Sequence, residues 1–382
     1  MGCRVVVEAF ISWTDKARAG DRAKAAKALG AAYVTASLPK DKQAGAYMAM
    51  SYLLDDPSPK VRLALAEALA CSKDAPRPII IALAEDQVEI ACPVIINSPV
   101  LRESDLVDLI GRGSSLTRAM IAARADLTAG VCAAMAEIGG DCEIVIMLEN
   151  VSARLTPVTL RRVCERFGEQ FEIRSLLLDR SDLPADVRHT LVLQVGEALA
   201  SAGIVSHVIT VARARQIVQD ASESAVTLIA GQASGQDRSD LVEHLCRQSQ
   251  LTPAFLLQLL CTGKLDFFAE AMSILSGLEE RRVRSILATG RHHAVKALYQ
   301  STGLVGRALE VFVEATRLWR QAAEMPYGGA VQQVAKRLLD MFSSRENDAS
   351  IYEMMSMIEK LLIVDQRQRA RSFAQELIAE AA

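Results

Sequence analysis

Two adjacent histidines, His292 and His293, are the residues best placed to carry out a reaction. Lys296 follows three residues after His293, so a helix would hold its ammonium group about one turn from that imidazole. A solvated imidazole can accept a phosphoryl group, and a nearby lysine offsets the charge that arrives with it. A phosphorelay component is therefore one hypothesis, and a pair of solvated or helix-capping histidines is the simpler alternative.

Arginines recur at comparable places along the first half of the chain, where stacked helices would bring them into one row. They are Arg62, Arg118, Arg124, Arg174 and Arg180. A row of guanidinium groups can follow a phosphate backbone, which makes nucleic-acid binding the main alternative function. Acidic residues on the same helices, such as Glu143 and Glu172, point to ion pairs instead. Aromatic residues, which stack on bases, are scarce at 4% of the chain.

The C-terminal tail carries an apolar face rich in methionine. Its residues recur at intervals of three and four, as on one face of a helix: Ile351, Met354, Met355, Ile358, Leu361 and Leu362. Methionine side chains re-pack readily around different partners. Met354 and Met355 are therefore candidates for a surface that binds a protein or dimerises. The alternative is that this face covers the end of the second half of the chain.

Isolated histidines and glycines give no sign of a metal or phosphate site. His189, His207 and His244 stand alone, without the spacing of metal ligands. Gly111-Arg112-Gly113 and Gly263-Lys264 lack the rest of a P-loop, and we expect these glycines to end helices in a left-handed conformation. We therefore expect no catalytic constellation, no metal and no cofactor, and a protein that is not an enzyme.

Composition limits the fold and the compartment. Of the 382 residues, 51% are hydrophobic, and helix formers dominate without any long alternating β-branched run, which predicts an all-α protein. The formal net charge of −3 disfavours a dedicated nucleic-acid binder. No signal peptide or apolar run of roughly 20 residues is visible, and the eight cysteines contain no Cys-x-x-Cys pair, which favours reduced thiols in a cytoplasmic protein.

A leucine followed by a polar or turn residue recurs before each expected second helix of a pair. In the first half the leucines are Leu101, Leu127, Leu155 and Leu183, which are 26, 28 and 28 residues apart. In the second half they are Leu251, Leu278 and Leu304, which are 27 and 26 residues apart. Two short helices and two turns need about this length, so the period predicts stacked helical repeats. The histidine pair lies inside this period rather than in a four-helix bundle, which favours its simpler interpretation.

The segment Leu53–Leu69 shows the turn between two such helices. Asp55 and Asp56 are expected to cap the second helix, and Pro57 and Pro59 fit the turn and a first helical turn. The string Leu54-Asp55-Asp56 followed after four residues by Val61-Arg62 resembles the HEAT-repeat signature. Residues 53–69 more specifically resemble a HEAT-like domain-of-unknown-function family of alphaproteobacteria, over roughly residues 1–310. The resemblance implies an α-solenoid and brings no catalytic residue.

These patterns predict a two-array helical-repeat solenoid. We expect a first array over residues 1–200, a helical linker over 201–235, a second array over 236–320 and a helical cap over 321–382. Because solenoids expose long surfaces, the leading hypothesis is a cytoplasmic scaffold or adaptor that binds a protein partner. Candidate contact residues are the arginines above together with Met354 and Met355. The partner's identity and the oligomeric state do not follow from the sequence.

Overall fold

The computed structural model describes residues 2–35, 39–202, 210–323, 330–342 and 349–381, and these ranges contain helices and no strand. The predicted all-α fold is confirmed. The helices up to Leu183 are α1 (Gly2–Thr14), α2 (Ala19–Thr35), α3 (Lys40–Leu53), α4 (Pro59–Leu69), α5 (Arg77–Ala84), α6 (Val88–Asn97), α7 (Glu103–Arg112), α8 (Ser115–Ala122), α9 (Ala129–Ile138), α10 (Asp141–Glu149), α11 (Pro157–Phe167) and α12 (Phe171–Leu178).

The remaining helices follow Pro184. They are α13 (Ala185–Ser201), α15 (Val211–Gln232), α16 (Gly235–Arg247), α17 (Pro253–Cys261), α18 (Leu265–Ser276), α19 (Glu280–Thr289), α20 (His292–Ser301), α21 (Gly306–Ala323), α22 (Ala330–Phe342) and α23 (Ala349–Ala381). Contacts divide the chain into two compact units, unit 1 (Met1–Leu183) and unit 2 (Pro184–Ala382). The division lies earlier than the expected boundary at residue 200, because α13 packs along α15 and α16.

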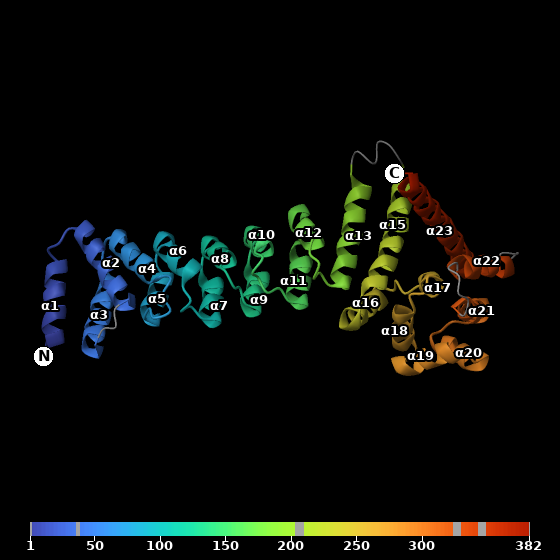
Figure 1. Cartoon of the computed structure of the whole chain (residues 1–382), viewed down its shortest axis with the longest axis horizontal. Coiled ribbons are helices and arrows are strands. Elements are labelled where there is room, and N and C mark those ends of the chain that lie inside the picture. The colour runs from blue at the N-terminus through green and yellow to red at the C-terminus, as the bar shows by residue number, and fades with distance from the viewer. Residues whose placement is uncertain (1, 36–38, 203–209, 324–329, 343–348, 382) are drawn as a thin grey trace. The chain divides into compact units, whose positions relative to one another are not determined.

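Unit 1 is built from two layers of stacked helices (Figure 1). In one layer α2, α4, α6, α8, α10 and α12 each lie against the next. In the other, α7, α9 and α11 stack in the same way, and α1 lies against α3. Since alternate helices along the chain belong to the same layer, each helix pair buries its apolar sides on its neighbours, as the repeat period predicted.

The recurring leucine and its capping residue account for the repeat locally. Leu127 is buried with 2% of its surface exposed. The next residue, Thr128, caps α9 by accepting a hydrogen bond from the Val131 amide. The same cap recurs at Thr156 on α11 and at Thr252 on α17. A side-chain oxygen at this position satisfies one of the free amides of the first turn, so the sequence fixes where each helix begins.

Two local predictions are wrong. Asp55 and Asp56 do not cap α4: its N-cap residue is Ser58, whose side chain makes no capping hydrogen bond. Asp56 instead binds Arg22, as described below. Gly113 ends α7 in an extended conformation and Gly111 lies within that helix, whereas Gly263 has the expected left-handed conformation with φ of 72°.

Unit 2 is organised around α17. Seven of its nine residues are buried, and it contacts α18, α21, α22 and α23. An aromatic group of Phe268, Tyr299 and Phe312 fills the core beside it, with ring centroids 5.4–6.5 Å apart. A helix buried on nearly all sides must be apolar all round, and α17 has the sequence Pro-Ala-Phe-Leu-Leu-Gln-Leu-Leu-Cys.

Substitution of Leu127 by Asp tests the repeat register in unit 1. An unpaired carboxylate buried between repeats should lower the free energy of unfolding by about 3–5 kcal/mol, as measured by urea unfolding followed by circular dichroism. The control is Val151→Asp, because Val151 is fully exposed and its replacement should change stability by less than about 0.5 kcal/mol. Equal stability of the two variants would contradict the register.

Candidate functional site

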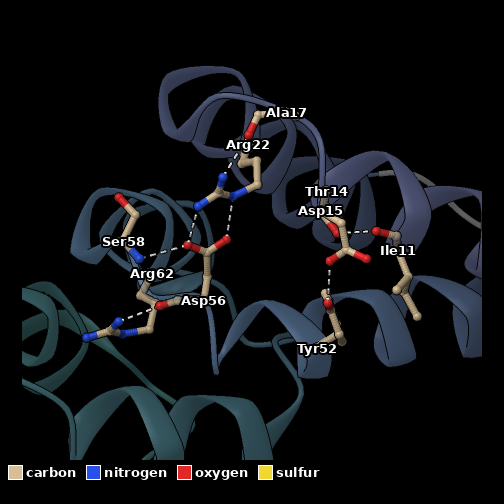
Figure 2. Close-up of polar contacts among 9 residues, drawn as sticks. All are labelled: Ile11, Thr14, Asp15, Ala17, Arg22, Tyr52, Asp56, Ser58 and Arg62. Carbon is tan, nitrogen blue, oxygen red and sulfur yellow. Dashed lines mark hydrogen bonds and ion pairs between the residues drawn. The ribbon is translucent and has the colours of Figure 1, made fainter.

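Arg62, the arginine of the signature segment, lies on α4 and bonds to the turn before its own helix and to the turn before α6. Its Nε and Nη2 donate to the Asp86 carboxylate at 2.6 and 3.1 Å, just before α6. Its Nη1 donates to the backbone carbonyl of Asp56 at 2.6 Å (Figure 2). The arginine side chain is 13% exposed. A planar guanidinium with five donors can bond to a carboxylate and a carbonyl at the same time. The guanidinium of Arg62 is therefore directed at groups of unit 1 and not at solvent.

Asp56 joins the same network from the other side. Arg22 of α2 donates to both its carboxylate oxygens, at 2.7 and 2.9 Å, and the Ser58 amide donates at 2.8 Å (Figure 2). Burial alone would raise the pKa of Asp56, but the hydrogen bonds from Arg22 and Ser58 outweigh it and hold that pKa below its ordinary value. The acidic turn residue therefore ties α2 to the start of α4.

The other arginines of the predicted row also bind within unit 1. Arg118 pairs with the buried Glu143 and donates to the Gly113 carbonyl. Arg124 donates to the carbonyls of Ile95 and Ser98. Closer along the chain, Arg174 donates to the carbonyls of Gly168 and Glu169, and Arg180 pairs with Asp182.

The long-range bonds join residues one repeat apart. Arg62 and Asp86 are 24 residues apart, Arg118 and Glu143 are 25, and Arg124 and Ser98 are 26. We call this set of bonds the arginine ladder. Three of the five predicted arginines therefore connect successive repeats, whereas Arg174 and Arg180 bond to groups within six residues of themselves. All five have donors engaged in bonds within unit 1.

The predicted methionine surface lies inside unit 2. Met354 is 0% exposed and Met355 is 7% exposed, and both belong to the core together with Ile351 and Ile358. The reason is that α23 packs against α17, α21 and α22. A helix that covers three others needs an apolar stripe on its inner face. The spacing of three and four residues in α23 is this stripe, so Met354 and Met355 are buried in the core in this structure. Residues 324–329 and 343–348, which separate the tail helices, lie outside the described residues.

The histidine pair occupies the start of α20. His292 and His293 are both exposed, with ring centroids 5.7 Å apart, and Lys296 is exposed one turn later. The helix has ten residues and packs against α18, α19 and α21. The pair therefore lies on a repeat helix rather than on one helix of a four-helix bundle. His207 lies outside the described residues.

A cavity in unit 2 includes a residue whose importance the sequence did not reveal. The cavity has a volume of about 380 Å³ and is lined from α13, α15, α17 and α23, with Glu223, Gln258, Glu353 and Lys360 among its polar side chains. Lys360 pairs with Asp220 at 2.7 Å and so connects α23 to α15. His189 forms part of the wall, is 0% exposed, and has no hydrogen-bond partner on either ring nitrogen.

Burial makes His189 hard to protonate. Desolvation, followed by the nearby His244 at 5.3 Å between ring centroids, lowers the pKa of His189 from 6.5 to about 4. A charged imidazole there would lose its hydration without gaining an acceptor. The sequence offered one signal, since His189 lies between the buried Val187 and Leu191, but His244 is 55 residues away and could not be associated with it.

Unit 1 carries three exposed apolar residues beside successive turns, which the sequence pattern did not reveal. Leu116 is the second residue of α8, Ile138 ends α9 and Phe171 starts α12, and they are 61%, 46% and 78% exposed. Each flanks the short turn inside one of three successive helix pairs. We call these three residues the turn edge. The exposed carboxylates of Asp141 and Glu172 lie within three residues of this set.

Comparison with known proteins places the chain in a family. Residues 90–351 match the model of a family described as uncharacterised proteins conserved in bacteria (DUF2336). The chain belongs to this family. The DUF2336 match spans parts of both units and confirms the expectation of a domain-of-unknown-function family, while the HEAT-like and alphaproteobacterial assignments stay predictions. Searches of curated proteins and of solved structures found no match.

Among the described residues, no group of three or more His, Cys, Asp or Glu side chains is arranged to hold a metal ion. Their helices include none with the length and apolar character needed to cross a membrane. The described cysteines are free thiols, and burial raises the pKa of Cys132 to about 11.

Replacing Arg62 by Met tests the arginine ladder. The change leaves the half-buried Asp86 carboxylate without its main donor, so the free energy of unfolding of unit 1 should fall by about 2–4 kcal/mol in urea denaturation. Arg112→Met is the matched control, because Arg112 is 72% exposed and its pair with Asp108 should contribute less than about 0.5 kcal/mol. A similar loss in both variants would show that the ladder does not stabilise the repeats.

The lowered pKa of His189 predicts that the stability of unit 2 falls in acid. Because its pKa is about 4 when folded and 6.5 when unfolded, the unfolded state binds the proton first as pH falls. The contribution to stability is complete above pH 6.5 and is lost on the way down to pH 4, by on the order of 3 kcal/mol. Urea midpoints measured between pH 4 and 7 should vary less in His189→Leu than in the parent, whereas His292→Gln should behave as the parent does.

Proposed function

We propose that this protein is a non-enzymatic cytoplasmic adaptor that binds another protein through the turn edge of unit 1. The observation that carries the proposal is the exposure of Leu116, Ile138 and Phe171 beside successive turns. Single exposed apolar residues are common on any protein. Here the stacking of the helices sets all three beside equivalent turns, and a group of exposed apolar residues at one edge of a surface is typical of a binding site.

The spacing of the turn edge fits a helical partner. Leu116 on α8 and Phe171 on α12 are separated by two steps of one helix layer, with α10 between them. Packed helices lie about 8–10 Å apart, so the edge spans roughly 20 Å. A helix rises about 1.5 Å per residue, so a segment of about 13 residues would cover it.

Charge indicates what such a segment would carry. Glu169 and Glu172 flank Phe171, Asp141 follows Ile138 by three residues, and all three carboxylates are exposed. A partner helix with apolar residues on one face and lysine or arginine at its margins would be complementary to this surface. The arginine ladder supports this choice of surface, because it occupies Arg62, Arg118 and Arg124 with bonds between repeats.

A capture experiment with paired variants tests the adaptor function. The tagged parent should retain a stoichiometric protein partner from the native cytoplasm after nuclease treatment, as measured by quantitative mass spectrometry. The amount of that partner captured by the double variant Leu116→Asp/Phe171→Asp should be at least tenfold lower, because the substitutions remove apolar contact area and add charge to the surface. Its thermal stability should be unchanged, because both sites are exposed.

Val305→Asp is the matched control, since Val305 is an exposed apolar residue of unit 2 outside the turn edge. It should retain the partner. A partner that the edge variant keeps would contradict the assignment of this surface, and partners that disappear with nuclease would transfer the function to nucleic acid.

A further inference from the structure

A second pocket in unit 2 has the features of a small-molecule site. It is open to solvent on one side, has a volume of about 440 Å³ and is lined from α17, α18, α19 and α21. Leu260, Leu265, Ala269 and Leu287 form its apolar wall, and the indole of Trp319 lies on one side. Concave, mainly apolar pockets of a few hundred Å³ with a small number of polar groups are typical of ligand sites in proteins.

Two arginines line this pocket, and they differ in their bonding. Arg284 is neutralised by Asp266 and Glu280, each at 2.5 Å. Arg320 is half-buried, and its guanidinium has no hydrogen bond or ion pair within the described residues. Thr316 in the wall is already bonded to Phe312 and Tyr299. Arg320 is therefore the charged group of the wall with unused donors, and the indole N–H of Trp319 is the neutral one.

The position of Arg320 depends on a glycine. A Cβ at Gly290 would overlap the Arg320 guanidinium, so the side chain rests against the bare backbone there. Gly290 has a φ of 58° and ends α19 in the left-handed conformation, which glycine adopts without strain. The end of α19 thus provides both a tight turn and the space that holds the guanidinium beside the pocket.

We propose that this pocket binds a small organic anion with an apolar body, of the class of medium-chain carboxylates. The carboxylate would accept two parallel hydrogen bonds from Arg320, a geometry that a guanidinium favours. The hydrocarbon body would lie against the leucines and Trp319, where its removal from water stabilises the complex. This site is independent of the turn edge, so it adds a ligand to the protein rather than depending on the adaptor function.

Trp319 allows binding to be observed directly. The chain has two tryptophans, so Trp13→Phe leaves Trp319 as the single reporter. Titration of this variant with octanoate should give a saturable change in fluorescence. Octanol has the same body without the charge and should bind at least tenfold more weakly.

Variants then identify the anion-binding group. Arg320→Gln in the same background should weaken octanoate binding at least tenfold and leave octanol binding nearly unchanged. Gly290→Ala should weaken octanoate similarly by displacing the guanidinium. Arg317→Gln is the control, since Arg317 lies on the same helix but is exposed and paired with Glu314, and it should bind octanoate as the parent does.

Three results would overturn the proposal: no saturable signal with octanoate, equal affinities for octanoate and octanol, or unchanged octanoate binding in Arg320→Gln. The octanol comparison uses a chain with an intact pocket, so it remains decisive if either pocket variant fails to fold.

Discussion

The hydrogen bonds of half-buried arginines across one repeat are the constraint on which unit 1 depends. Burial of apolar surface is not directional in itself, so it sets the register of the helix layers less sharply than a directional bond does. Guanidinium bonds are directional, and each one fixes a carboxylate or carbonyl of the neighbouring repeat at a definite register. Arg62 shows this most fully, because it holds Asp86 of the next repeat ahead of α6, while a second bond to the Asp56 carbonyl fixes the guanidinium against the turn before its own helix α4.

The two apolar surfaces described above belong to different units and suit different ligands. The turn edge is a set of exposed side chains beside successive turns, which suits a helical partner long enough to reach all three. The pocket beside Trp319 is concave and has one arginine with free donors, which suits a small anion. A protein that contains both surfaces can hold a macromolecule in one unit and a metabolite-sized molecule in the other, without either site requiring catalytic groups.

Local patterns explain most of what the sequence predicted correctly. The leucine period, the threonine caps and the proline at the start of α4 act within a few residues, so the chain shows them directly. The roles of Arg62 and Met354 depend on which helices become neighbours. The sequence around an arginine does not show whether its side chain faces solvent or an acidic residue 24 positions away. Likewise, the spacing of an apolar stripe on α23 is the same whether the stripe contacts a partner or α17. His189 was missed for the same reason, since the absence of a hydrogen-bond partner is a property of the folded surroundings. The pocket residues, drawn from four helices, could not have been assembled from spacing.

The layered contacts of unit 1 also bear on how it forms during synthesis. Every bond of the arginine ladder spans 30 residues or fewer, and each helix contacts those nearest to it in the chain. Such low contact order allows folding to proceed from a completed pair without waiting for distant sequence. Unit 1 can therefore be assembled progressively on the ribosome, each new repeat docking on a surface that is already in place.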